Sequence, residues 1–270
     1  MITTSIVRTC WRWHLVLALA AGLLAAAPPA TLRIATYNVE NMFDRYDDPY
    51  TEDSSTARGT APKPARALYA LARVIKAVNA DIIMLQEVEN RNFLAEFNAA
   101  YLDGMKYIHV VLIEANNSTA GGRGIDVALL SRVPVYSATS YQYQQHPLPS
   151  GTRVRFSRDF LHVRLRPEGF PELHVFTLHA PSRLGGEYSE ARRVTEAKLA
   201  AAILREQFAH NSNVWIVIGG DFNDGDGSPS LNVFTSIPGV PMRRVPAFDA
   251  KGSPFTWMSA GSAYQPDTLD

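Results

Sequence analysis

Polar side chains that suit phosphate and metal chemistry follow four short apolar segments of the sequence. Asn38 follows segment 32–37, Glu87 follows 81–85, His179 follows 173–178, and Asp221 and Asn223 follow 214–218 after a predicted diglycine turn, Gly219-Gly220. In α/β folds, ligands bind in the crevice beyond the strand ends. These side chains are therefore candidates for one common site.

The residue types at these strand ends favour a site for a hard cation and a phosphate. Carboxylate and amide oxygens from separate strands suit Mg²⁺ or Mn²⁺, with positions left for water and a phosphoryl group. His179 fits poorly as a ligand in such a set, and it is better suited to donate a hydrogen bond or proton to a phosphoryl oxygen. Each residue alone also has a simpler interpretation as a turn or helix cap.

Strand and helix patterns alternate from Thr31 onward. We predict strands at 32–37, 81–85, 107–114, 125–130, 135–143, 160–166, 173–178 and 214–218, and helices at 65–79, 91–101 and 189–209. The four strands between residues 125 and 178 have no helix between them, which favours antiparallel pairing. No linker divides the sequence. We therefore predict one α/β domain with a mixed, mostly antiparallel core.

Composition excludes several classes of protein, and the N-terminus indicates export. The 270 residues are 46% hydrophobic with a single cysteine, which excludes disordered, collagenous and disulfide-stapled chains. Residues 1–27 carry Arg8 and Arg12, then an uncharged segment that ends in three alanines. This pattern predicts a signal peptide and a periplasmic or extracellular protein, with an uncleaved membrane anchor as the alternative.

The charge balance gives no overall attraction to nucleic acid. The chain has 26 Lys+Arg and 26 Asp+Glu, and removal of Arg8 and Arg12 leaves 24 basic against 26 acidic residues. Binding of a polyanion would therefore need a local basic patch. One candidate patch lies on and before the strand predicted at 160–166, with a charged, solvent-facing edge strand as the alternative interpretation: Arg153, Arg155, Arg158, His162, Arg164 and Arg166.

Four local motifs, taken in order, resemble the endonuclease/exonuclease/phosphatase superfamily. They are Thr36-Tyr37-Asn38-Val39-Glu40-Asn41, Leu85-Gln86-Glu87-Val88-Glu89, Leu178-His179-Ala180-Pro181-Ser182 and Gly220-Asp221-Phe222-Asn223. The resemblance runs from about Thr31 to Asp270. It implies a four-layer α/β/β/α sandwich with two mainly antiparallel sheets, as in deoxyribonuclease I, and hydrolysis of phosphoesters with a divalent metal. Nothing in the sequence indicates a stable protein partner, and we expect a monomer.

The same resemblance assigns roles to individual residues. Glu87 would be the principal metal ligand with Asn38 beside it. Asp221 and Asn223 would position the attacking water or hold the phosphate, and His179 would stabilise the pentacovalent phosphate.

Two further residues resemble family positions less specifically. Glu114 ends the strand predicted at 107–114, as does the acid that orients the strand-end histidine in the deoxyribonuclease branch, so a Glu114–His179 pair is expected. Arg183 is a candidate phosphate contact, and a solvated surface charge is an equal alternative.

The resemblance is incomplete at the C-terminus. Family members normally continue from a segment like 261–270 into another strand and a Ser-Asp-His motif, whose histidine is a general base or phosphate partner. Asp270 resembles the aspartate that orients this histidine, which the sequence does not contain. We therefore expect a domain at 31–270 without its last strand, and we favour a truncated chain over a natural pseudoenzyme.

Three functions fit these observations. The first is an exported, metal-dependent phosphodiesterase that acts on DNA or RNA. The second is a phospholipid or sugar-phosphate esterase of the same fold, and the third is a non-catalytic binding protein with an incomplete site. Turnover that depends on a divalent metal separates the first two from the third.

Overall fold

A computed structural model of the protein describes residues 31–46, 61–115, 123–246, 248 and 252. Contacts divide the chain into residues 1–32 and 33–270, and every described helix and strand lies in the second unit. The predicted signal peptide at 1–27 and Asp270 lie outside the described residues. Within the described part, no helix is long and apolar enough to cross a membrane.

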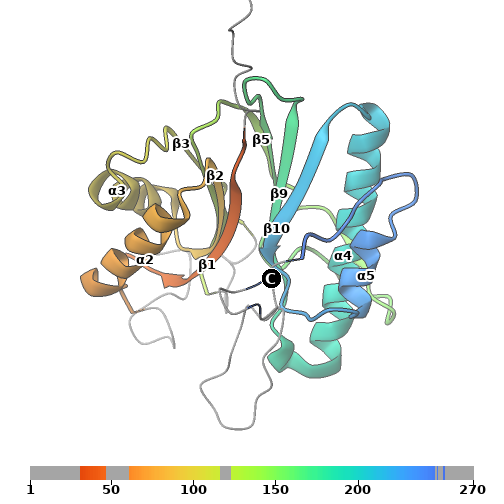
Figure 1. Cartoon of the computed structure of the whole chain (residues 1–270). Coiled ribbons are helices and arrows are strands. Elements are labelled where there is room, and N and C mark those ends of the chain that lie inside the picture. The colour runs from red at the N-terminus through yellow and green to blue at the C-terminus, as the bar shows by residue number, and fades with distance from the viewer. Residues whose placement is uncertain (1–30, 47–60, 116–122, 247, 249–251, 253–270) are drawn as a thin grey trace, which may run out of the picture. The chain divides into compact units, whose positions relative to one another are not determined.

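The first sheet has four strands in the order β1-β2-β4-β3. Its strands are β1 (Ile34–Met42), β2 (Ile82–Val88), β3 (His109–Leu112) and β4 (Asp126–Ser131). β1 pairs parallel with β2, and the other two pairs are antiparallel. Helices α2 (Ala65–Val78) and α3 (Arg91–Tyr101) cover its outer face (Figure 1).

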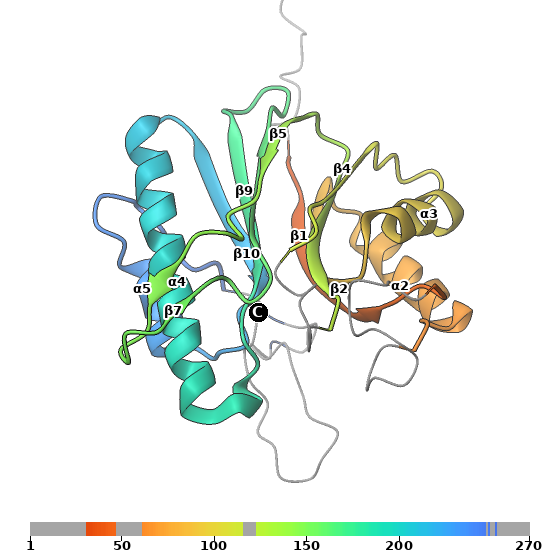
Figure 2. The same cartoon turned by 180° about the vertical axis from the view of Figure 1, so that it is seen from behind.

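The second sheet also has four strands, in the order β10-β9-β8-β5. They are β5 (Val135–Thr139), β8 (Phe160–Leu165), β9 (Leu173–His179) and β10 (Trp215–Asp221), and only β9 and β10 pair parallel. Helices α4 (Gly186–His210) and α5 (Pro229–Thr235) cover its outer face. A short hairpin, β6 (His146–Pro147) and β7 (Arg153–Val154), lies against α4 (Figure 2).

These layers form the predicted α/β/β/α sandwich, with the two sheets face to face in the middle of this unit (Figures 1 and 2). The predicted helix at 91–101 is confirmed, and most other predicted elements differ from the observed ones by a few residues at their ends. The hairpin β6–β7 and the helix α5 were not predicted, because segments this short show no clear hydrophobic period.

Strand alternation separates two outer cores from a layer between the sheets. Leu85 of β2 packs with α2 and α3, and Leu178 of β9 packs with α4. Residues at alternate positions face the opposite sheet instead. At Gly219, a Cβ atom would lie 2.3 Å from Cε of Met84 on the facing sheet, so the absence of a side chain allows the sheets to approach closely there.

The prediction of a diglycine turn at 219–220 was wrong. Both glycines continue β10, where Gly220 pairs in register with Leu178. A Cβ atom at Gly220 would lie 2.1 Å from the Leu178 carbonyl oxygen, and φ is +153° at this residue. The glycines therefore serve close packing within and between the sheets, and β10 extends to Asp221.

The predicted basic patch around β8 does not form a surface stripe. β8 is an inner strand between β9 and β5, so the edge-strand alternative was wrong as well. His162 is 2% exposed, and its Nε2 lies 3.1 Å from Nδ1 of His174. Nε2 of His174 lies 3.1 Å from Oε1 of Glu172, which also accepts a hydrogen bond from Nε of Arg164 at 2.7 Å.

Burial keeps these two histidines neutral. It lowers the pKa of His162 to about 3, with smaller contributions from His174 and Arg164. Burial also lowers the pKa of His174, although the hydrogen bond to Glu172 opposes this effect. Both imidazoles take up a proton more readily in the unfolded chain than in the folded one.

We therefore predict that acid destabilises the fold through this pair. Because the folded-state pKa is lowered, the contribution to stability is complete above pH 6.5 and is lost as the pH falls from 6.5 toward 3. When the pH falls from 7 to 5, each histidine that stays neutral in the folded state should lower the free energy of unfolding by about 1 to 2 kcal/mol. Urea unfolding at the two pH values measures this loss.

His162→Gln should reduce this pH-dependent loss, because it removes one group that is protonated on unfolding. His210→Gln, at the exposed end of α4, is the matched control and should leave the loss unchanged. An equal loss in wild type and His162→Gln would show that His162 does not contribute to the pH dependence of stability.

Candidate active site

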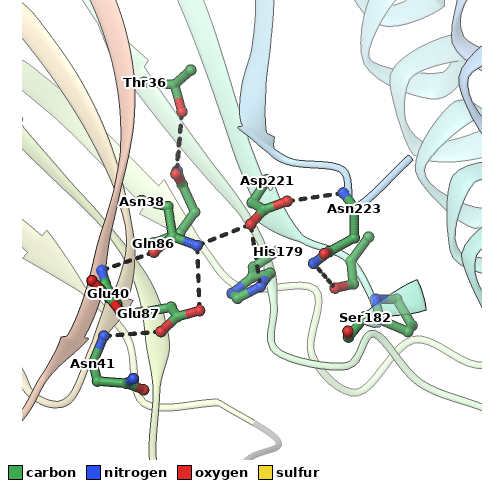
Figure 3. Close-up of polar contacts among 12 residues, drawn as sticks. Thr36, Asn38, Glu40, Asn41, Gln86, Glu87, His179, Ser182, Asp221 and Asn223 are labelled. Atoms are coloured by element: carbon green, nitrogen blue, oxygen red, sulfur yellow. Dashed lines mark hydrogen bonds and ion pairs between the residues drawn. The ribbon is translucent and has the colours of Figure 1, made fainter. Parts of the chain in front are cut away.

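Four strands bring five of the predicted residues together (Figure 3), with Asn38 inside β1, not at its end as predicted, and the other four at or near the ends of β2, β9 and β10. Asn38 lies on β1 and Glu87 on β2, whereas His179 and Asp221 are the last residues of β9 and β10 and pair in register. Asn223 follows two residues after Asp221. The site therefore forms because two parallel pairs of strands, one from each sheet, end side by side.

A bulge in β2 turns Glu87 toward the site. Leu85 packs on the helix side of the sheet, so regular alternation would place Glu87 on that side too. The register instead shifts between Gln86 and Val88, and Glu87 has a left-handed backbone with φ +65°. An extra residue of this kind re-aims a side chain and is common beside active sites.

The side-chain amide of Asn38 connects the two sheets. Its Nδ2 donates to Oε1 of Glu87 at 3.3 Å and to Oδ2 of Asp221 at 2.9 Å, as Figure 3 shows. Its Oδ1 accepts a hydrogen bond from the Glu40 backbone N–H at 2.9 Å. The amide nitrogen thus faces both carboxylates, and ligation of a metal through Oδ1 would need the amide to rotate.

Asn223 supports Asp221 from the following loop. Its backbone N–H donates to Oδ1 of Asp221 at 2.9 Å, and its Nδ2 donates to the Ala180 carbonyl oxygen at 3.0 Å. The residue holds a left-handed backbone with φ +49°, which asparagine tolerates better than most residues. Burial raises the pKa of Asp221, the hydrogen bonds from Asn38 and Asn223 oppose the rise, and the nearby Glu87 carboxylate adds to it.

His179 is buried at the floor of the site, with 4% of its surface exposed. Its Nε2 lies 3.7 Å from Oδ2 of Asp221, beyond hydrogen-bond distance, and Nδ1 has no hydrogen-bond partner among the described residues. Burial lowers the pKa of His179 well below its usual range, and the Arg158 and Arg123 guanidinium groups lower it further. The ring is therefore a neutral imidazole in this environment.

Two arginines bring positive charge to the site. Arg123 forms a hydrogen bond with Oδ1 of Asn41, and its Nη2 lies 3.6 Å from Oε2 of Glu87. Arg158 lies close enough to Glu87 and Asp221 to interact electrostatically with both, and burial lowers its pKa. These groups partly compensate the charge of the two carboxylates.

The two less specific candidates, Glu114 and Arg183, are both exposed. Glu114 lies beyond the end of β3 and is exposed, and it forms no hydrogen bond with Nδ1 of His179. The acid expected to orient the histidine therefore does not do so here. Arg183 is exposed and begins a short 3₁₀ helix, η2 (Arg183–Gly185), in the segment after β9. Its role as a phosphate contact stays a prediction.

The residues present suit a hard cation. The Glu87 and Asp221 carboxylates lie close enough to accept hydrogen bonds from the same nitrogen, and oxygen donors of this kind are those that Mg²⁺ and Mn²⁺ prefer. In the described part of the chain, no group of three or more His, Cys, Asp or Glu side chains is arranged to hold a metal. Mg²⁺ commonly binds one or two carboxylates and takes its other ligands from water and phosphate.

Sequence reasoning missed Arg123 and Asn41 and placed Arg158 on a surface. Arg123 lies in the segment Gly121-Gly122-Arg123-Gly124, whose composition indicates only a loop. Arg158 precedes a buried strand, where a basic residue is unusual enough to serve as a signal. Asn41 lies in the first family motif, but its residue type does not reveal its contact with Glu87, because a backbone N–H donates to Oε2 of Glu87 at 2.9 Å.

We predict that the backbone at Glu87 is strained and that glycine relieves the strain. Glu87→Gly should be more stable than Glu87→Ala by about 1 kcal/mol, because a left-handed backbone disfavours residues with a Cβ atom. Both variants lose the same carboxylate contacts, so these cancel in the comparison. Thermal unfolding of the two variants measures the difference.

A position inside a helix provides a control for which the stability difference between Gly and Ala should have the opposite sign. Glu96 is exposed in the middle of α3, where Gly should be less stable than Ala by about 1 kcal/mol. If Glu87→Gly were also less stable than Glu87→Ala, the left-handed backbone at residue 87 would not be a source of strain.

Comparison with known proteins identifies the family. A family model described as the Endonuclease/Exonuclease/phosphatase family matches residues 33–236, and no curated protein matches the sequence. The human nocturnin catalytic domain with bound sulfate has 15% identity and a TM-score of 0.53, covering 76% of this chain and 69% of that chain. SmcL has 17% identity and a TM-score of 0.51, and the match covers 77% of this chain and 69% of SmcL.

A third solved structure, the beta toxin 275-280 from Staphylococcus aureus, has 15% identity and a TM-score of 0.51, with 76% and 70% coverage. The chain covers 45 to 56% of the length of the Caenorhabditis elegans TDP2 chains that it also matches. At these identities the solved structures show a shared fold, whereas the family model spans most of the chain. The chain therefore belongs to the endonuclease/exonuclease/phosphatase family.

Proposed function

We propose that the chain is a divalent-metal-dependent phosphodiesterase with DNA or RNA as its substrate. The observation that carries this proposal is the convergence of Glu87 and Asp221 on the Asn38 amide, with a neutral His179 beside them. Members of this family are phosphoric ester hydrolases, and their metals are generally divalent. The residues at this site suit that chemistry.

Glu87 and Asp221, with Asn38 after rotation of its amide, are the residues that would hold the cation. Bound Mg²⁺ or Mn²⁺ supplies positive charge to the non-bridging and leaving oxygens of the phosphodiester. Asp221 is oriented by the hydrogen bonds from Asn38 and Asn223, and it is available to orient an attacking water. His179, as a neutral imidazole, can donate one N–H to a phosphoryl oxygen.

The arginines around the site favour a polyanionic substrate. Arg123 and Arg158 lie within electrostatic reach of the Glu87 carboxylate, and Arg183 is exposed in the segment that follows His179. Guanidinium groups bind phosphate in a bidentate geometry. In a chain with no net charge, the exposed Arg123 and Arg183 are the groups that would meet a nucleic-acid backbone, whereas Arg158 is partly buried.

A phospholipid substrate is the second candidate, and two exposed apolar residues favour it. Leu184 is 91% exposed on η2, and Tyr188 is 59% exposed one helical turn later. Both follow Arg183 in the segment after β9, which ends at His179. Exposed apolar side chains beside a phosphate site suit contact with a lipid surface.

Hydrolysis assays test the proposed function. The chain from residue 28 is incubated with bis-p-nitrophenyl phosphate, plasmid DNA, RNA or sphingomyelin vesicles in the presence of Mg²⁺, Mn²⁺ or EDTA. We expect cleavage of nucleic acid that EDTA abolishes. Cleavage of vesicles alone would support the lipid alternative, and a folded chain that cleaves nothing would leave a binding protein as the better description.

Variants locate the activity in the described site. Glu87→Gln should lose nearly all metal-dependent turnover, and His179→Ala should lower kcat by about 10²- to 10³-fold, because each removes a group that stabilises developing charge. Asp103→Asn, exposed beyond α3, is the matched control and should retain wild-type activity. Full activity in folded Glu87→Gln would place the metal elsewhere.

We further propose that residues 1–27 direct export of the chain. The support is the arrangement of Arg8 and Arg12 before an uncharged segment that ends in alanines. Mass spectrometry of the protein recovered from a bacterial periplasm should find the mature N-terminus near residue 28. Recovery of the intact N-terminus from the membrane fraction would support an anchor instead.

A further inference from the structure

Arg193 of α4 connects the two loops that directly follow His179 and Asp221, the active-site residues at the ends of β9 and β10. The side chain is buried, with 6% of its surface exposed. Its Nε donates to Oδ2 of Asp224 at 3.1 Å, and its Nη1 donates to the Pro181 carbonyl oxygen at 3.3 Å. Asp224 lies in the loop after β10, and Pro181 lies in the loop after β9.

Asp224 is held from a second side as well. Its Oδ2 also accepts a hydrogen bond from Oγ of Ser230 in α5 at 2.7 Å, and its side chain is 10% exposed. A buried ion pair adds little to stability compared with an apolar replacement, because both charges lose their hydration. The arrangement is therefore better explained by the geometry that it imposes than by stability alone.

The contacts of Arg193 constrain the segments next to the active-site residues. Pro181 follows two residues after His179, and Asp224 follows directly after Asn223. The two loops also contact each other, since the Ala180 N–H donates to the Asp221 carbonyl oxygen at 2.8 Å and Nδ2 of Asn223 donates to the Ala180 carbonyl oxygen. Arg193 adds a third connection, made from the helix beneath them.

This connection matters because the side chains of His179 and Asp221 do not form a hydrogen bond with each other. Their nearest atoms lie 3.7 Å apart, and Nδ1 of His179 has no partner among the described residues. The position of the imidazole therefore depends on its backbone and on packing. A contact that holds the backbone of both loops therefore fixes the positions of His179 and Asp221 relative to each other.

We propose that Arg193, together with Asp224, is a positioning pair for the phosphodiester site. The proposal rests on the proposed function and assigns Arg193 no contact with substrate or metal. Its charge serves to hold the loops 180–182 and 222–224 at a fixed separation. Displacement of a catalytic group by about 1 Å can lower turnover by about 10²-fold, so the expected effect is on kcat.

Kinetics of three variants test the pair. Arg193→Met and Asp224→Asn should each lower kcat on bis-p-nitrophenyl phosphate by about 10²-fold, while KM and the Kd for Mn²⁺ change less than about threefold. Arg193→Lys retains the charge but has one donor nitrogen in place of Nε and Nη1, and it should recover part of kcat. Arg205→Met, exposed on the same helix, is the matched control and should behave as wild type.

Amide hydrogen exchange tests the same pair without any need for turnover. In Arg193→Met and Arg193→Lys, the amides of Ala180 and Asn223 should exchange at least tenfold faster than in wild type, whereas the amide of Val175 within β9 should keep its protection. If wild type hydrolyses no substrate, the proposed function fails, and the exchange rates still decide whether Arg193 holds the loops.

Two results would overturn the positioning role. One is wild-type exchange at Ala180 and Asn223 in folded Arg193→Lys and Arg193→Met. The other is faster exchange in these variants with kcat within twofold of wild type, in a chain that does hydrolyse the substrate. A parallel loss of Mn²⁺ affinity and kcat would also contradict it, because it would show that Arg193 acts through the metal site.

Discussion

The Asn38 amide is the contact on which the site depends, because it holds two carboxylates from different sheets against one nitrogen atom. Like charges repel at this distance, and the Asn38 amide and the nearby Arg123 reduce the repulsion between the two carboxylates. The sheets must approach closely for this contact to form. Gly219, which leaves room for Met84 of the facing sheet, permits that approach next to the strand end that carries Asp221.

Unfavourable features of the structure gather at the same strand ends. Glu87 and Asn223 hold left-handed backbones, and the His179 imidazole is buried without a hydrogen bond to its Nδ1 among the described residues. The strands that lead to them are regular and largely buried. Such locally unfavourable conformations persist only where the surrounding structure enforces them, and they are typical of functional sites. The Arg193–Asp224 pair contacts the loops that adjoin two of these residues, His179 and Asn223.

Much of the fold and site could be predicted from the sequence, and the failures have physical causes. Apolar periodicity located α3 and most strands, and the short motifs identified Asn38, Glu87, His179 and Asp221, which the structure brings together. Periodicity could not show that Gly219 and Gly220 lie inside a strand, because a close approach between sheets leaves no local pattern. It also could not show that His162 is buried, since its partners His174 and Glu172 come from elsewhere in the chain.

The central claim is that Glu87 and Asp221 form one cation site across the two sheets. Calorimetric titration of Mn²⁺ into wild type, Glu87→Gln, Asp221→Asn and the double variant tests it most directly. We expect one site in wild type, with a Kd that rises at least tenfold in each single variant and binding that is lost in the double variant. Wild-type affinity in either folded single variant would contradict the account, because the two carboxylates would then not share an ion.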